Sequence, residues 1–128
     1  MRDEFYRKVA KRAQHKCEYC HAPEAPCGYK FHVEHILPCS RGGSDDLSNL
    51  ALCCAPCNLH KSNNIEKEGV RFFHPRQDSW EDHFTWNDDY TIVIGKTKIG
   101  QITIEALQMN NPRAIQARKR WILSGDHP

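Results

Sequence analysis

Four cysteines in two CxxC pairs have the spacing that points most directly to chemistry. Cys17 and Cys20 form the first pair, Cys54 and Cys57 form the second, and 33 residues separate the two pairs. Four thiolates presented as two such knuckles are the ligand set of a closed tetrahedral zinc site, which has no open position and is therefore structural. In so short a chain, zinc binding is expected to supply folding free energy on the order of 10 kcal/mol, as in zinc-finger peptides.

The other three cysteines are Cys27, Cys39 and Cys53, and we interpret them as small apolar fillers or free thiols. Cys53 is adjacent to Cys54 and could replace it as a ligand, although only Cys54 has CxxC spacing with Cys57. The odd number of cysteines favours metal binding in a reducing compartment over disulfides. A redox protein would instead carry a single CxxC at a helix start in a βαβ setting, and the sequence lacks that pattern.

A carboxylate beside a histidine forms the second group of reactive residues. Glu34 directly precedes His35, and Asn58 directly follows the second CxxC pair. Carboxylate and amide oxygens can hold a hard divalent cation, and an imidazole, which titrates near neutral pH, can take a proton from water. These residues predict a metal-dependent hydrolytic site. Because neighbours on a regular strand point to opposite faces, we expect irregular backbone there, at the strand end before Pro38.

The elements that must position these residues follow from local patterns. A helix is predicted from Asp3 to about His15, a loop over His21–Gly28, a strand within Tyr29–Leu37 and a turn at Ser40–Asp46. A short returning strand at Leu50–Cys53 and a helix from Pro56 to about Asn63 complete the predicted set. The order strand, long loop, strand and helix predicts a compact ββα unit.

The chain changes character after Lys67. A strand at Tyr90–Ile94, a helix at Thr97–Met109 and a last helix from Asn111-Pro112 through Leu123 are predicted. We therefore expect an α+β fold in which a zinc-braced core at residues 1–68 carries an extension at 69–128, whose strand and helices pack on the core.

The order and spacing of the reactive residues resemble those of the HNH endonucleases, in the subgroup whose ββα-metal motif is braced by two CxxC pairs. The resemblance covers roughly Cys17 to Asn64 and implies a treble-clef-like core. It is carried by Val33-Glu34-His35-Ile36-Leu37-Pro38, Arg41-Gly42-Gly43, Asn49-Leu50-Ala51-Leu52-Cys53-Cys54, Cys57-Asn58 and Lys61.

The resemblance implies a role for each matched residue. His35 would be the general base for hydrolysis of DNA phosphodiester bonds, and Glu34 and Asn58 would hold a single divalent cation. Asn49 would fix the loop between the strands and so the orientation of His35. Many members have Asp at the position of Glu34 and His at that of Asn58, and the amide here favours magnesium or manganese.

Contacts with DNA would have to come from local basic residues, because the 128-residue chain has a formal charge of only +2. Arg41 and Lys61 are the residues we expect to contact phosphate, although a solvated surface role fits each nearly as well. Two further clusters lie within Arg2–Lys16 and near Trp121, and for both a solvated helix face is an equal alternative. Their members are Arg7, Lys8, Lys11 and Arg12, and Arg113, Arg118, Lys119 and Arg120.

Two features of the sequence bear on where the protein acts. No apolar run approaches the roughly 20 residues needed to cross a bilayer, and Met-Arg-Asp-Glu at the start lacks the apolar core of a secretion signal, so we predict a soluble cytoplasmic protein. The sequence leaves open whether it acts as a monomer or a homodimer. A non-catalytic, zinc-dependent nucleic-acid-binding module is the alternative function, although it would not need Glu34, His35 and Asn58 together.

Overall fold

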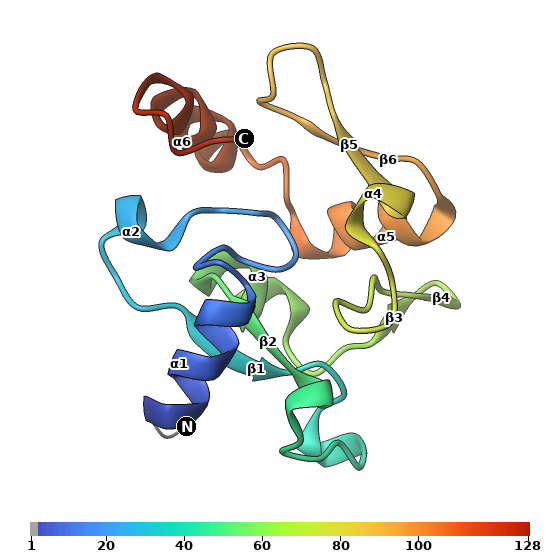
Figure 1. The fold of residues 1–128 in the computed structure, drawn as a ribbon. Coiled ribbons are helices and arrows are strands. Elements are labelled where there is room, and N and C mark those ends of the chain that lie inside the picture. The colour runs from blue at the N-terminus through green and yellow to red at the C-terminus, as the bar shows by residue number, and fades with distance from the viewer. Residues whose placement is uncertain (1–2) are drawn as a thin grey trace.

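A two-stranded antiparallel sheet, followed by a helix, lies at the centre of the N-terminal half (Figure 1). In the computed structural model, which describes residues 3–128, β1 (His32–His35) pairs with β2 (Leu50–Cys53), and α3 (Ala55–Lys61) begins two residues later. The fold is thus α+β with the predicted ββα unit. Arg2, with which the first basic stretch begins, lies outside the described residues.

The first helix, α1 (Asp3–Arg12), packs against this sheet through Val9 and Ala10, which are fully buried. Acidic residues in its first turn and basic residues in its last turn complement the helix dipole. Arg12 donates hydrogen bonds to the carbonyl oxygens of Leu47 (2.9 Å) and Leu50 (2.6 Å). This member of the predicted basic cluster therefore braces the start of β2.

The predicted loop at 21–28 contains a short helix, α2 (Glu24–Cys27), which ends at Gly28 with φ of 77°. The buried carboxylate of Glu24 accepts hydrogen bonds from the Tyr6 hydroxyl (2.6 Å) and the backbone N–H of Phe31 (2.7 Å). These bonds fix one turn of helix between α1 and β1. The prolines and glycine of this segment predicted a loop, because their spacing does not reveal the hydrogen bonds to Glu24 that stabilise the helical turn.

The loop between β1 and β2 is held by the side chain of Asn49. Its Oδ1 accepts from the backbone N–H of Leu37 (2.8 Å), and its Nδ2 donates to the carbonyl oxygens of Leu37 (3.0 Å) and Ser44 (2.8 Å). Gly43 packs so closely that a Cβ there would lie 1.7 Å from the Leu37 oxygen. The loop contains two short 3-10 helices, η1 (Cys39–Arg41) and η2 (Leu47–Asn49).

The chain after α3 forms two small hairpins and three helices, and all of these except β3 lie in the predicted extension (Figure 1). Their bounds are β3 (Glu66–Lys67), β4 (Val70–Arg71), α4 (Trp80–His83), β5 (Phe84–Trp86), β6 (Val93–Gly95), α5 (Lys98–Leu107) and α6 (Pro112–Leu123). Both long helices lie close to the predicted positions. The α6 start has the predicted cap, since the Asn111 side chain accepts from the backbone N–H of Ala114 (3.0 Å).

The predicted strand at 90–94 is shifted toward β6, and its partner β5 was not predicted. The side chain of Asn87 accepts hydrogen bonds from the backbone N–H groups of Thr91 (2.9 Å) and Ile92 (3.0 Å), which closes a turn where the strand was expected to begin. Regular pairing, with Trp86 opposite Val93, begins only after that turn.

One hydrophobic core extends from the N-terminal half into the extension, with Leu52, Phe73 and Leu107 among its buried members. The Trp80 indole N–H donates to the carbonyl oxygen of Tyr19 (2.9 Å), and its ring stacks on His21 at 4.0 Å between centroids. Helix α5 packs against α3. The extension is thereby fixed against both the first knuckle and the helix that follows the second.

The extension also contains an acid-sensitive ion pair. Asp78 accepts two hydrogen bonds from Arg71 (2.7 and 3.0 Å) and one from the backbone N–H of His74 (2.9 Å). The Arg71 guanidinium holds the pKa of Asp78 below its usual range. The unfolded chain therefore binds this proton more readily, and the stabilisation is lost as the pH falls through the lowered pKa of the folded state.

Replacing this carboxylate tests the linkage. We expect Asp78→Asn to lower the free energy of unfolding by about 1–3 kcal/mol at neutral pH and to flatten its decline below the ordinary aspartate pKa. Urea unfolding curves at stepped pH values measure both effects. Asp88→Asn, at an exposed position, is the matched control, and an identical acid profile for the two variants would contradict the assignment.

Candidate functional site

The four predicted zinc ligands meet in one buried cluster. The Sγ atoms of Cys17, Cys20, Cys54 and Cys57 all lie within 4.8 Å of one another, and those of Cys20 and Cys54 are 3.7 Å apart. Two sulfurs on a tetrahedral zinc, with Zn–S bonds of about 2.3 Å, would lie about 3.8 Å apart. The residues therefore fit a structural zinc ion, and Cys53 is not part of the cluster.

Backbone hydrogen bonds place both knuckles. In the first, the backbone N–H of Cys17 donates to the Ala22 carbonyl (2.9 Å), and that of Glu18 donates to the Leu52 carbonyl of β2 (2.9 Å). In the second, Cys54 caps α3. The zinc cluster thus joins the end of the α1 segment to the start of the helix that carries Asn58.

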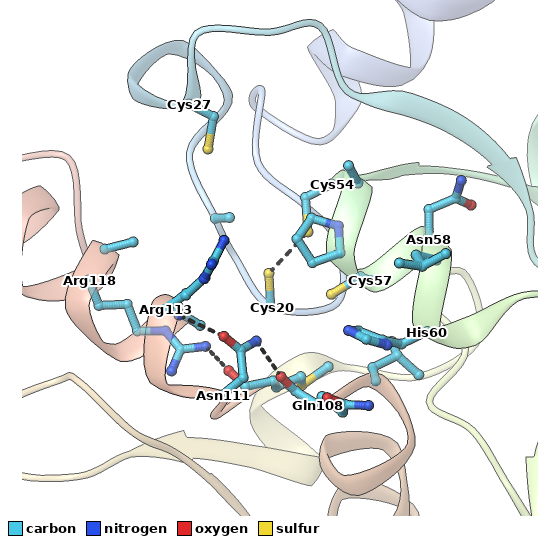
Figure 2. Close-up of a pocket in the computed structure, with 18 of the residues that line it drawn as sticks. Cys20, Cys27, Cys54, Cys57, Asn58, His60, Gln108, Asn111, Arg113 and Arg118 are labelled. Carbon is cyan, nitrogen blue, oxygen red and sulfur yellow. Dashed lines mark hydrogen bonds between the residues drawn. The ribbon is translucent and has the colours of Figure 1, made fainter.

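The four thiols share charge unequally. Burial opposes ionisation of Cys17, but hydrogen bonds from the other thiols hold its pKa well below the usual range. The hydrogen bond with Cys17 raises the pKa of the Cys57 thiol well above its usual range. A second thiolate in this cluster would therefore need a cation beside it, which is the role that a divalent metal fills. Cys27 stands apart from Cys20, Cys54 and Cys57 in Figure 2, and burial raises its pKa to about 11.

Removal of the metal should unfold the chain. We expect a strong chelator, or Cys57→Ser, to abolish the cooperative thermal transition, because loss of zinc removes on the order of 10 kcal/mol from a small core. Circular dichroism and zinc analysis measure the two effects together. Cys39→Ser, at an exposed thiol, is the control, and a folded, zinc-free Cys57→Ser protein would contradict the structural role.

Glu34, His35 and Asn58 line one hollow of about 360 Å³ at the end of β1. The structure therefore brings together the three residues predicted for the hydrolytic site, from β1 and α3. The remaining wall comes from β1, the loop after it and the residues that follow α3, through Val33, Pro38, Cys39, Ser40, Ser62 and Asn63.

The backbone at Glu34 and His35 is more regular than expected. Both residues pair with β2, opposite Ala51 and Leu50 respectively, and the bend begins only at Ile36. Alternation along the strand buries Glu34, whereas the side chain of His35 remains 23% exposed. Both reach the same hollow because it lies at the end of the strand rather than on one face.

Glu34 has two partners inside the protein. The Tyr19 hydroxyl donates a hydrogen bond to its Oε1, and the Lys61 ammonium lies 3.4 Å from its Oε2. Burial raises the pKa of Glu34, although the neighbouring ammonium opposes that rise. The lysine supplies the countercharge without which a carboxylate at this depth would be strongly disfavoured.

Of the two residues predicted to contact phosphate, Lys61 is buried and Arg41 is exposed. The Lys61 side chain is only 2% exposed and donates to the carbonyl oxygen of Ile36 (3.2 Å), so it faces inward rather than toward solvent. The demand of Glu34 for a counterion explains this placement. Arg41 lies on η1, where its Nε donates to the carbonyl oxygen of Asn63 (3.1 Å).

His35 has a partner that the sequence did not reveal. Its Nε2 lies 2.6 Å from Oδ1 of Asp45, which is on the loop between the strands. The turn pattern gives no sign of this contact, because Asp45 and Asp46 fit the turn equally well. An ionised carboxylate can only accept, so Nε2 carries the proton and Nδ1 keeps a free lone pair.

Four cysteine sulfurs around one position, beside a ββα unit that carries Glu34, His35 and Asn58, define a small zinc-braced α+β core. Residues 17–64 match the family model described as HNH endonuclease. This segment is therefore similar to the HNH endonucleases, and the match covers less than half of the chain. Neither a curated protein nor a solved structure matched. Within residues 3–128, no helix combines the length and apolar character needed to span a membrane.

Proposed function

We propose that the protein is a metal-dependent endonuclease that hydrolyses DNA phosphodiester bonds at the hollow between β1 and α3. The observation that carries the proposal is that Glu34, His35 and Asn58 line this one hollow. The family match over residues 17–64 supports a nuclease function. The side chains of His35, Glu34 and Asn58 would supply a base and two oxygen ligands.

His35 would act as the general base. Asp45 accepts a hydrogen bond from the Nε2–H group of His35. The free lone pair on Nδ1 can therefore take a proton from water as the water oxygen attacks phosphorus. The bond from phosphorus to the leaving 3′ oxygen then breaks, and that oxygen takes a proton from solvent. Asn49 would act as a positioning residue, because its side chain binds the backbone of Leu37, near His35, and of Ser44, the residue before Asp45.

Glu34 and Asn58 would hold the divalent cation through oxygen atoms, a donor set that suits magnesium or manganese. When bound, the cation would neutralise charge on the phosphate and stabilise the leaving 3′ oxygen. Glu34 fits this role in part, because the ammonium of Lys61 already lies beside Oε2. Exposed Arg41 would contact a neighbouring phosphate.

A non-catalytic nucleic-acid-binding module is the second candidate, and the Glu34–Lys61 pair favours it. A buried carboxylate that is already neutralised by a lysine can serve the fold alone. In that case the zinc cluster and the basic surface residues would suffice, and the hollow would hold no cation.

Nicking of supercoiled plasmid separates the two candidates. With magnesium or manganese, we expect wild-type protein to nick and His35→Ala to lose about 10²- to 10⁴-fold in rate, the usual contribution of a general base. His32→Ala is the matched control, because His32 is exposed three residues earlier on β1 and does not line the hollow.

Circular dichroism should show both variants folded. DNA binding without nicking by the wild type, or equal nicking by His35→Ala, would reject the enzyme and leave the binding module.

A further inference from the structure

Three metal-ligating side chains converge at the exposed side of the hollow, apart from the zinc cluster. A nitrogen of His35, the sulfur of Cys39 and a carboxylate oxygen of Asp45 all lie within 4.8 Å of one another. His35 ends β1, Cys39 begins η1 and Asp45 lies on the loop between the two 3-10 helices. Glu34 and Asn58 contribute nothing to this group.

The loop holds these three residues in place. Asn49 binds Leu37 on one side and the carbonyl oxygen of Ser44 on the other, so the backbone on either side of Cys39 and next to Asp45 is fixed. The side chain of Asp45 is 74% exposed and Cys39 is also exposed. Their side chains can therefore shift while the backbone stays still.

We propose that His35, Cys39 and Asp45 bind a zinc-like divalent ion, and that this ion switches the nuclease off. One imidazole nitrogen, one thiolate and one carboxylate form a three-ligand zinc set with an open fourth position. The thiolate excludes magnesium, which prefers oxygen ligands alone. One thiolate and one carboxylate also balance the charge of a divalent ion.

The geometry requires only a small adjustment. Ligand atoms of His and Asp on a tetrahedral zinc lie about 3.3 Å apart, given bond lengths of about 2.0–2.1 Å. Nε2 of His35 and Oδ1 of Asp45 are now 2.6 Å apart. A small outward movement of the exposed Asp45 side chain opens this space, while the ring proton of His35 passes from Nε2 to Nδ1 through solvent and the Cys39 thiol proton is lost to solvent.

The inhibition rests on the proposed function. It arises because metal binding to one ring nitrogen of His35 places the proton on the other. With Asp45 as partner, Nε2 carries the proton and Nδ1 is the free base. With a metal ion on Nε2, the neutral ring carries its proton on Nδ1, and no lone pair remains to accept one from water. Metal binding therefore removes the base without displacing His35.

Metal binding is tested first, without reference to activity. Cobalt(II) is added to full-length protein that retains its structural zinc, and the sulfur-to-cobalt charge-transfer band is followed. We expect one further equivalent to bind wild type with this band, and Cys39→Ala to lose the band with an affinity at least about 10- to 100-fold lower, the loss typical of an outer-shell partner alone. Ser40→Ala is the matched control, because Ser40 is the next residue of η1 and lines the same hollow.

A wild-type protein without the band, or Cys39→Ala with an undiminished band, would overturn the proposal. The second result would mean that cobalt had exchanged into the four-cysteine cluster. Asp45→Asn with the adjacent Asp46→Asn as control repeats the test on the carboxylate, so the outcome does not depend on one variant remaining folded.

Inhibition is tested second, by plasmid nicking in magnesium with added zinc. Each protein is compared with its own rate in magnesium without zinc. We expect zinc to suppress nicking by wild type and by Ser40→Ala, whereas Cys39→Ala needs at least about tenfold more zinc for the same fractional inhibition. Equal zinc sensitivity in wild type and Cys39→Ala would reject the switch. A protein that binds cobalt through Cys39 but never nicks would instead reject the proposed nuclease and keep the site.

Discussion

Four sulfur atoms that must share one position are the constraint on which the rest of the structure depends. Cys17 and Cys20 follow α1, whereas Cys54 and Cys57 begin α3, so the cluster closes a loop that contains all of β1 and β2. Because Asn58 directly follows Cys57, the same closure brings α3 beside the end of β1. The hollow exists because the cluster holds its two walls together.

Charged and polar side chains at and around the hollow are arranged in two layers. The inner layer contains Glu34 with Tyr19 and Lys61, all buried, and the outer layer contains His35 with Asp45, which are open to solvent. Strand alternation produces this separation, since Glu34 and His35 are adjacent on β1. In the proposed mechanism, the carboxylate that would hold a cation is thereby kept apart from the base that would meet water.

The sequence was most informative where a pattern is local or a ligand spacing is rigid. The CxxC pairs, the order of β1, β2 and α3, and the Asn111 cap all follow from neighbouring residues, and the structure has each of them. The family match over residues 17–64 agrees with the resemblance drawn from the same motifs. The division at residue 68 stays a prediction, as do the catalytic roles.

What the sequence could not supply depends on contacts between distant residues. The inward direction of Lys61 is set by Glu34, which is 27 positions away in the chain, and a lysine at the end of a helix ordinarily points to solvent. The partner of His35 depends on how a loop folds back, and the α2 turn depends on bonds from Tyr6 and Phe31 to one carboxylate. The shifted strand at β6 depends on one asparagine side chain.

The ion pair between Lys61 and Glu34 implies that the fold depends differently on the structural zinc and on the proposed magnesium or manganese ion. With an internal ammonium already beside the carboxylate, Glu34 needs no metal ion to balance its charge. The four cysteine sulfurs, by contrast, fit a zinc ion as the group that joins them. Under the proposed nuclease function, the scaffold would therefore be complete before the catalytic ion binds, and separate ions would govern architecture and reactivity.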